Sequence, residues 1–198
     1  MIERSGYSII ALLCILSLAF LIIHPLISIL LLLFAIFTAY FFRDPERDIG
    51  EGIVSPADGK VDYISGNRLE IFMSPLDCHV NRSPVSGEVK SVKFFEGKTP
   101  PAFMRVEGVR KNEIVIRNSD GDFKIQQIAG FFARRIVCYV KPGDRVVKGQ
   151  RIGMIRFGSR VTLEVPDGFV FAIKVGEKVK AGETVAFKDE YIQASHSS

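Results

Sequence analysis

A Gly-Ser pair near the C-terminal end of the chain is the first candidate for chemistry. Gly158 and Ser159 lie between two runs rich in β-branched residues, Arg151–Ile155 and Val161–Val165, which predict strands. Glycine leaves room for the next side chain to approach the carbonyl group behind it. The Ser159 hydroxyl can therefore attack the peptide bond that joins it to Gly158. The alternative is an ordinary tight turn with a glycine at positive φ, and these residues alone favour the turn.

His79 is the best placed of the three histidines for acid-base chemistry. It falls in a polar, turn-rich segment, Met73–Pro84, between two predicted strands, and loops on rigid scaffolds often carry functional groups. His24 lies between two apolar segments and His196 in a serine-rich tail, so we predict that both are incidental. A single histidine is more often a surface residue or a satisfied core residue, which remains the alternative.

Asp58 is the candidate partner for such a histidine. In the segment Ser55–Gly59 it is typical of a turn aspartate that precedes glycine. Its carboxylate can also accept a hydrogen bond from a histidine Nδ1–H, which leaves the other ring nitrogen free to take a serine proton. Cys78 adjoins His79, but adjacent residues in an extended segment point to opposite faces. We expect Cys78 to be buried and not to act as a thiol nucleophile.

Two uncharged apolar segments, residues 8–23 and 26–42, precede these candidates. His24-Pro25 between them predicts a helix break. A full span needs roughly 20 apolar residues, so we predict a helical membrane hairpin, inserted shallowly or spanning a thinned bilayer. A signal peptide is the first alternative, but the first segment lacks a small-residue cleavage site. A single long bent helix is the second.

The charges around the hairpin predict its orientation. Arg4 precedes it, and Arg43 and Arg47 follow it, so both ends and the domain that follows are predicted to face the cytoplasm. The three cysteines are odd in number and widely separated, which favours a reducing compartment and indicates no zinc spacing. The net charge of +4 suits nucleic acid or an anionic membrane. The apolar N-terminus favours the membrane, and we expect no nucleic-acid partner.

Beyond the hairpin and a polar linker that ends at residue 52, the pattern changes to that of a β domain, residues 53–198. Short β-rich runs alternate with glycine, proline, asparagine and aspartate, which is typical of an all-β sandwich or barrel. The runs are Gly59–Val61, Leu69–Phe72, Gly87–Val89, Glu113–Ile116 and Phe123–Ile125. Ala129–Ala133 is a weak helical candidate.

Two internal repeats refine this prediction. Ser55–Val61 recurs in outline as Ser83–Val89, and Val140–Val146 recurs as Ile173–Val179. The second pattern resembles the hairpins of lipoyl and biotinyl carrier domains. We therefore predict a mainly β fold, a pseudo-symmetric β-sandwich of lipoyl- or hammerhead-like halves. A fold of this kind does not by itself indicate a function.

Four motifs occur in a fixed order along nearly the whole chain. Together they resemble the phosphatidylserine decarboxylase family, in the short form that includes archaetidylserine decarboxylases. Each motif alone is a weak signal, but the four in order are specific. They are Phe42–Arg47, Val54–Gly59, Met73–Arg82 and Phe157–Ser159.

The resemblance implies a self-processing proenzyme with a covalent pyruvoyl group and neither a metal nor pyridoxal phosphate. Ser159 attacks the Gly158 carbonyl, the ester breaks by β-elimination, and residue 159 becomes the pyruvoyl group. That group forms a Schiff base with the substrate amine and serves as the electron sink for loss of CO₂. The products are a β chain, 1–158, and an α chain, 159–198, held as a heterodimer that can form higher oligomers. His79 matches the family's general acid/base, and Asp58 matches the aspartate that orients it.

The implied substrate is a membrane lipid, phosphatidylserine or archaetidylserine, which is converted to the ethanolamine lipid. The hairpin then holds the active site at the interface. Arg82 stands where longer bacterial members have a second histidine, so that histidine's role does not carry over to this chain. Several basic residues are candidates for binding the lipid head group, although a solvated surface charge is the better explanation for each one taken alone. They are Arg105, Arg110, Lys111, Arg134 and Arg135.

Two other functions compete with this hypothesis. A membrane-anchored lipoyl-like carrier needs a lysine after aspartate at a hairpin tip, which neither repeat offers, and an adaptor of that kind is expected to carry coiled-coil heptads. A serine hydrolase that uses Ser159 lacks Gly-x-Ser-x-Gly between a strand and a helix. Decarboxylation of a serine phospholipid is therefore the predicted function.

Overall fold

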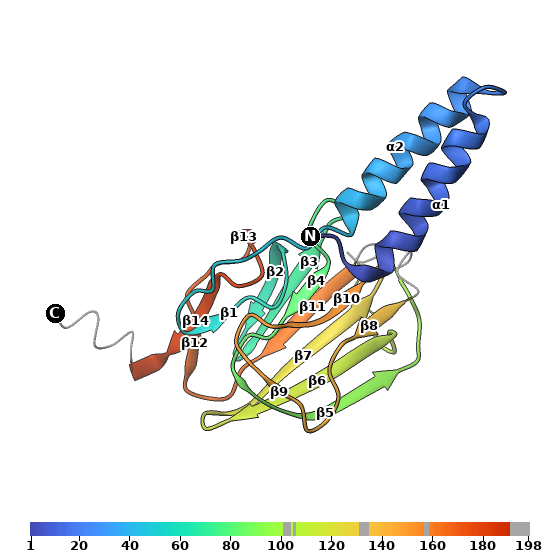
Figure 1. Ribbon diagram of the computed structural model, residues 1–198. Coiled ribbons are helices and arrows are strands. Elements are labelled where there is room, and N and C mark those ends of the chain that lie inside the picture. Colours follow the sequence, from blue (N-terminus) through green and yellow to red (C-terminus); the bar gives the residue numbers. More distant parts are fainter. Residues whose placement is uncertain (101–103, 105, 131–134, 157–158, 191–198) are drawn as a thin grey trace. The chain divides into compact units, whose positions relative to one another are not determined.

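The computed structural model describes residues 1–100, 104, 106–130, 135–156 and 159–190 (Figure 1). The chain divides into two compact units, Met1–Glu46 and Arg47–Ser198. The first unit is helical and the second is built from β-strands. The boundary precedes residue 52, so the polar linker residues after Glu46 are part of the β unit.

The helical unit is an antiparallel pair, α1 (Arg4–Phe20) and α2 (Pro25–Phe41). Glu3 caps α1 by accepting a hydrogen bond from the backbone N–H of Ser5 at 2.8 Å. Pro25 begins α2, where its missing N–H costs nothing. Both helices begin earlier than the predicted 8–23 and 26–42, because capping decides a helix start and apolar composition does not.

Two serines join the helices of this unit. The Oγ of Ser17 donates to the carbonyl of Ser28 at 2.9 Å, and the Oγ of Ser28 donates to the carbonyl of Ser17 at 2.7 Å. Both serines are buried, so each hydroxyl is satisfied inside the hairpin. Each helix is 17 residues long. Among the described residues, neither helix combines the length and the apolarity that crossing a membrane requires.

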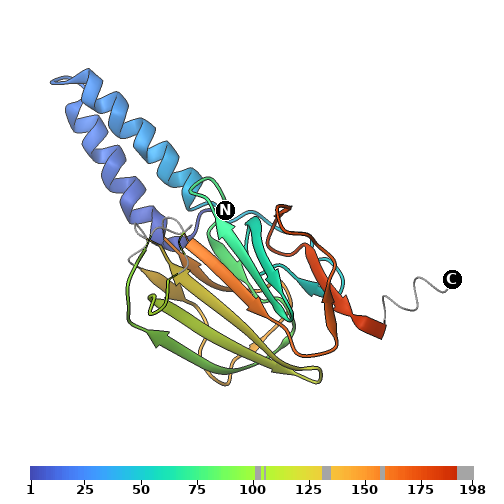
Figure 2. The ribbon, with the colours of Figure 1, turned by 180° about the vertical axis from the view of Figure 1, so that it is seen from behind.

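The second unit holds fourteen strands within its described residues, which confirms the mainly β prediction. An antiparallel sheet of eight strands has the order β13-β2-β3-β11-β7-β6-β5-β9, and its curl is visible from both sides in Figures 1 and 2. Two smaller sheets have the orders β1-β14-β12 and β4-β10-β8. The strands are β1 (Ile53–Val54), β2 (Gly59–Ser65), β3 (Arg68–Met73), β4 (Val80–Arg82), β5 (Gly87–Phe95), β6 (Lys111–Asn118), β7 (Gly121–Ala129), β8 (Ile136–Cys138), β9 (Arg145–Val146), β10 (Arg151–Ile155), β11 (Ser159–Glu164), β12 (Phe169–Phe171), β13 (Lys178–Val179) and β14 (Thr184–Lys188).

Every run predicted as a strand lies within or overlaps an observed one. The helical candidate Ala129–Ala133 differs, because Ala129 ends β7 and residues 131–134 lie outside the described part of the chain. The tendency of alanine to form helices is weak beside the ladder that β7 makes with β11 and β6.

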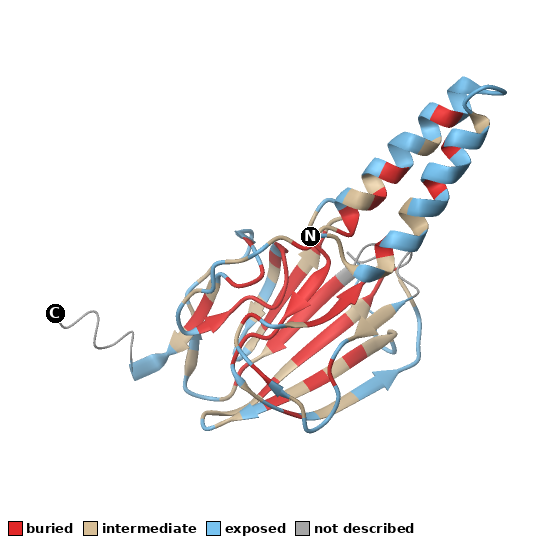
Figure 3. Ribbon diagram, in the orientation of Figure 1, coloured by how far each residue is buried: buried red, intermediate tan, exposed pale blue. Residues whose placement is uncertain are grey.

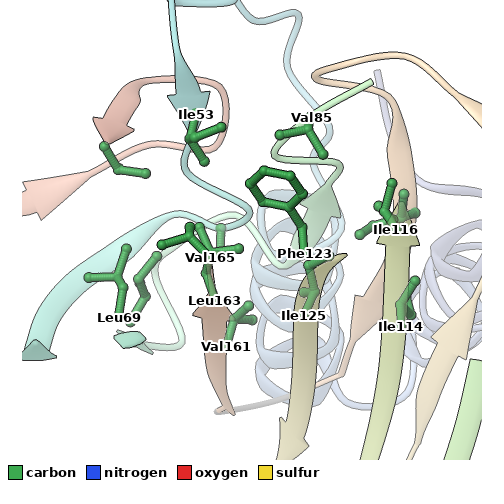
Figure 4. Close-up of a cluster of buried hydrophobic side chains, with 14 of the residues drawn as sticks. Ile53, Leu69, Val85, Ile114, Ile116, Phe123, Ile125, Val161, Leu163 and Val165 are labelled. Carbon is green, nitrogen blue, oxygen red and sulfur yellow. The ribbon is translucent and has the colours of Figure 1, made fainter. Parts of the chain in front are cut away.

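The core lies on the inner face of the large sheet. Side chains alternate along each strand, so every second residue of β3, β6, β7 and β11 points inward. These residues form one buried cluster, shown in red in Figure 3 and as sticks in Figure 4. It includes Leu69, Ile71, Ile114, Ile116, Phe123, Ile125, Val161 and Leu163. Each such side chain stabilises the fold by about 1.5–3 kcal/mol, which makes these strands a rigid support.

The sequence repeats make matching backbone contacts. Val61 accepts a hydrogen bond from the N–H of Gly176 at 2.8 Å, and Val89 accepts one from the N–H of Gly143 at 2.8 Å. Both glycines adopt positive φ, 99° and 89°, which side chains disfavour. The β13–β2 and β9–β5 pairs are therefore equivalent, as the repeated sequence requires.

Candidate active site

Ser159 is the first residue of β11, in the middle of the large sheet. Its backbone lies opposite Met73, the last residue of β3, and opposite Ala129, the last residue of β7. Both neighbours are buried. Ser159 therefore begins a strand and does not occupy a turn, while Gly158 lies outside the described residues. The first residue of β11 and the last residues of β3 and β7 therefore lie side by side, at the same end of these three strands.

His79 directly precedes β4 and is completely buried. Its Nδ1 lies 2.9 Å from the backbone carbonyl oxygen of Asp77. A carbonyl oxygen can only accept, so Nδ1 carries the proton and Nε2 is the nitrogen that can take one up. The loop that carries His79 is itself fixed, because the Asp77 carboxylate accepts a hydrogen bond from the backbone N–H of Ser74 at 2.7 Å.

Asp58 has other partners in this structure. Its Oδ1 accepts from the N–H of Ala181 at 2.8 Å, and its Oδ2 pairs with Arg47 at 2.6 Å. The predicted contact is with Nδ1 of His79, but the acceptor recorded for that nitrogen is the Asp77 carbonyl. In this structure Asp58 ties the start of the β unit to the C-terminal hairpin. Its role in orienting His79 stays a prediction.

Arg82, at the position of the family's second histidine, is a buried connector. Its Nη1 donates to the carbonyl of Gly149 at 2.9 Å, and its backbone N–H donates to Pro56 at 2.9 Å. It links the end of β4 to the turn before β10. An arginine in this position holds the scaffold near His79 and, because a guanidinium group does not give up its proton in proteins, is unsuited to acid-base chemistry.

A family model described as phosphatidylserine decarboxylase matches residues 34–187 of this chain. The chain belongs to the phosphatidylserine decarboxylase family. The match spans His79, Asp58 and Ser159, and it confirms the resemblance predicted from the four motifs.

Three relatives place the chain within this family. A protein of Archaeoglobus fulgidus named as an archaetidylserine decarboxylase proenzyme is 67% identical over 98% of this chain and 100% of its own length. One of the same name from Methanococcoides burtonii is 47% identical over 77% of this chain and 75% of its own length. A phosphatidylserine decarboxylase proenzyme of Streptomyces coelicolor is 48% identical over 76% and 72%.

Among solved structures, glucose permease IIA from Mycoplasma capricolum matches with a TM-score of 0.39 and 16% identity. It covers 68% of this chain and 92% of that chain. A similarity at this level supports no conclusion about this chain.

The basic residues proposed for head-group binding are only partly described. Arg110 pairs with Glu96 at 2.5 Å, the ammonium of Lys111 lies 5.1 Å from the ring centre of Phe95, and Arg135 is exposed. Arg105 and Arg134 lie outside the described residues. Arg110 and Lys111 thus have partners within the protein, which favours the surface-charge alternative for these two.

Sequence reasoning missed an ion cluster beside Ser159. Arg160 contacts Glu70 at 2.5 Å and Asp62 at 2.7 Å, and its side chain is only 5% exposed. Arg68 also pairs with Glu70, at 2.9 Å. On this outer face of the sheet lies a cavity of about 780 Å³, lined in part by Arg160, Glu70 and Gln126. Direct adjacency to Ser159 was the signal that could have identified Arg160.

A chain of three side-chain amides was also missed. Gln127 of β7 donates from Nε2 to Oδ1 of Asn81 at 2.8 Å, and Asn112 of β6 donates to Oε1 of Gln127 at 2.8 Å. All three residues are completely buried. The signal was present in the alternation of β7, where Phe123, Ile125 and Ala129 are inward positions and Gln127 shares their face.

Proposed function

We propose that this chain is a self-processing proenzyme whose mature form removes CO₂ from the serine head group of a phospholipid, yielding the ethanolamine lipid. The single observation that carries the proposal is the match to the phosphatidylserine decarboxylase family across both His79 and Ser159. The relatives are named for archaetidylserine and for phosphatidylserine, so either lipid is a candidate substrate.

Self-cleavage at Gly158-Ser159 uses only groups of this chain and water. The Ser159 Oγ adds to the Gly158 carbonyl carbon, and the hydroxyl proton passes to Nε2 of His79 in our proposal. The proton then moves to the amide nitrogen as the C–N bond breaks, which leaves an ester. Loss of the Ser159 Cα proton expels the Gly158 carboxylate, and water releases ammonia to leave a ketone on residue 159.

The residues around Ser159 fit a pyruvoyl group at this position. As the first residue of β11, residue 159 becomes a chain terminus at the edge where β3 and β7 also end. The pyruvoyl group supplies the electron sink for loss of CO₂. We propose that His79, which is buried and held by the Asp77 carbonyl at Nδ1, delivers a proton from Nε2 to the carbon that has lost CO₂.

The strand order supports a heterodimer of the two product chains. β11 belongs to the α chain and lies between β3 and β7 of the β chain, and β13 pairs with β2. After cleavage, these ladders keep the α chain inserted in the sheet without a covalent link. The matched repeat contacts support the predicted pair of interlocked hammerhead-like halves.

We place the helical unit at the cytoplasmic face of the membrane, inserted shallowly. Both helices carry many exposed large apolar side chains, as helices that bind a membrane surface do. They include Leu12, Ile15, Leu18, Leu30, Leu33 and Phe34. The reciprocal Ser17–Ser28 hydrogen bonds leave no hydroxyl of this pair to be solvated by lipid.

The test is release of labelled CO₂ from vesicles that contain a serine lipid with a labelled carboxyl group. We expect release with diacyl phosphatidylserine, with the isoprenoid-ether lipid, or with both, and the comparison identifies the preferred backbone. Ser159→Ala is expected to stay uncleaved and inactive. His79→Ala is expected to block cleavage, decarboxylation or both. A fully processed and fully active His79→Ala protein would remove His79 from the mechanism.

A further inference from the structure

The buried amide chain runs toward Ser159 on the inner face of the sheet. Gln127 and Ala129 share that face of β7, and the backbone of Ala129 lies opposite Ser159. At the other side, Nδ2 of Asn81 lies 3.9 Å from the sulfur of Met73, whose backbone also lies opposite Ser159. Asn81 therefore ends the chain at Met73, one of the two strand neighbours of Ser159.

The hydrogen bonds give the chain a direction. Asn112 donates to Gln127, and Gln127 donates to Asn81, so the N–H₂ group of Asn81 faces the Met73 sulfur. The reversed arrangement would set an amide oxygen against a thioether, two acceptors in contact. A thioether is a weak acceptor, so a buried N–H₂ group has been left without a strong acceptor within the described residues.

The far end of the chain is also incomplete. The Oδ1 of Asn112 is buried and has no donor among the described residues. A polar network satisfied at neither end stabilises a core less than apolar side chains of similar size. Among the described residues, these three amides therefore stabilise the fold less than apolar side chains would, and a donor role beside Ser159 would give them a function.

We propose that Asn81 is a hydrogen-bond donor to the reacting groups at Ser159, and that Gln127 and Asn112 are positioning residues that aim it. The inference rests on the proposed function. Its ligand is the oxyanion that forms on the carbonyl preceding Ser159 when the hydroxyl adds to it. In that step the C–O bond forms, the carbonyl π electrons move to oxygen, and the Asn81 N–H₂ group stabilises the negative charge without giving up its proton.

The test follows self-cleavage of the full-length chain after cell-free synthesis in detergent. The wild-type chain of 22.1 kDa is expected to convert to two chains. Asn81→Leu, of similar volume, is expected to slow conversion by about 100-fold, the usual effect of losing one oxyanion donor. Gln127→Leu, which leaves the donor present but poorly aimed, is expected to slow conversion by up to about 100-fold and no more than Asn81→Leu does.

A matched control is Thr162→Val in β11. Thr162 is also completely buried, and its hydroxyl contacts Gln126 at 3.4 Å on the outer face of the sheet. We expect Thr162→Val to cleave at the wild-type rate. The difference between the two variants separates loss of a donor near Ser159 from loss of any buried polar group.

A second variant separates a loss of the donor from a loss of folding. Asn81→Leu leaves the Gln127 amide without its acceptor, whereas replacing Asn81, Gln127 and Asn112 together by leucine leaves no unpaired group. We expect the triple variant to melt no lower than Ser159→Ala and yet to cleave as slowly as Asn81→Leu.

Two results would overturn the inference. Wild-type cleavage by a folded Asn81→Leu or triple variant would refute the donor role alone and leave the proposed function intact. A wild-type chain that never cleaves would refute the proposed function, and this inference with it.

Discussion

Replacing Arg160 tests whether the ion cluster next to the cleavage residue stabilises the sheet. Arg160 and Glu70 have side chains that are 5% and 6% exposed, so solvent screens this pair little. Removing one partner of a buried pair costs about 3–5 kcal/mol, because the other charge stays buried. Glu70 keeps Arg68 at 2.9 Å, and Arg68 is 38% exposed. For Arg160→Met we therefore expect the low end, about 3 kcal/mol.

The assay is urea unfolding of the full-length chain in detergent, in a Ser159→Ala background that we expect to remain a single chain. At a slope of about 1–3 kcal/mol/M, the midpoint should fall by about 1–3 M with an unchanged slope. Lys124→Met is the matched exposed control. Lys124 pairs with Glu164 at 3.0 Å but is 38% exposed, so we expect a loss below about 1 kcal/mol.

A double-mutant cycle identifies the cause. Adding Glu70→Leu to Arg160→Met removes the more deeply buried of the two carboxylates that Arg160 contacts, so the double variant should be more stable than Arg160→Met alone. Losses that simply add, or an Arg160→Met protein within about 0.5 kcal/mol of its parent, would refute the assignment of a coupled buried pair.

Two further predictions concern pH and packing. A hydrogen bond from Arg117 lowers the pKa of Asp122 to about 2, below its usual value near 3.9. The ionised Asp122 carboxylate therefore stabilises the folded state fully above about pH 4, and this stabilisation is lost as the pH falls toward 2. In thermal unfolding, Asp122→Asn should reduce the loss of stability between about pH 4 and pH 2 by less than about 1 kcal/mol, because the Arg117–Asp122 pair is exposed. The same pH dependence in Asp122→Asn and in the wild-type protein would refute this role of Asp122. Gly153→Ala would place a Cβ 2.6 Å from the Val137 carbonyl oxygen and 2.7 Å from Nε2 of Gln127, so we expect a loss of about 1–3 kcal/mol in urea unfolding and slower self-cleavage on gels. Wild-type values for both would show that the site tolerates displacement of Gln127.

Much of the fold could be predicted because strand composition is a local property. The runs around Ser159 are rich in β-branched residues, and both are strands. The sequence repeats predicted a pseudo-symmetric fold, and the β13–β2 and β9–β5 pairs are equivalent in the structure. The order of the large sheet could not be predicted in this way, since the pairing of Ser159 with Met73 joins distant segments through backbone groups that every residue type shares.

The candidate site was predictable in its residue types and less so in its contacts. Family motifs selected Ser159, His79 and Asp58, and the match to the family model confirms the resemblance on which that choice rests. The acceptor for Nδ1 of His79 is a backbone carbonyl, and the sequence could not predict this contact because every residue has a backbone carbonyl. Asn81 and Gln127 were missed because their burial depends on how β4 packs against the large sheet.

The intact mass spectrum of the purified, denatured protein tests the central claim most directly. The account predicts two chains that divide between Gly158 and Ser159, with the smaller resisting Edman degradation because a ketone replaces its amino terminus. A single chain of 22.1 kDa from a folded preparation would contradict it. Gly158-Ser159 would then be an ordinary segment at the start of a strand.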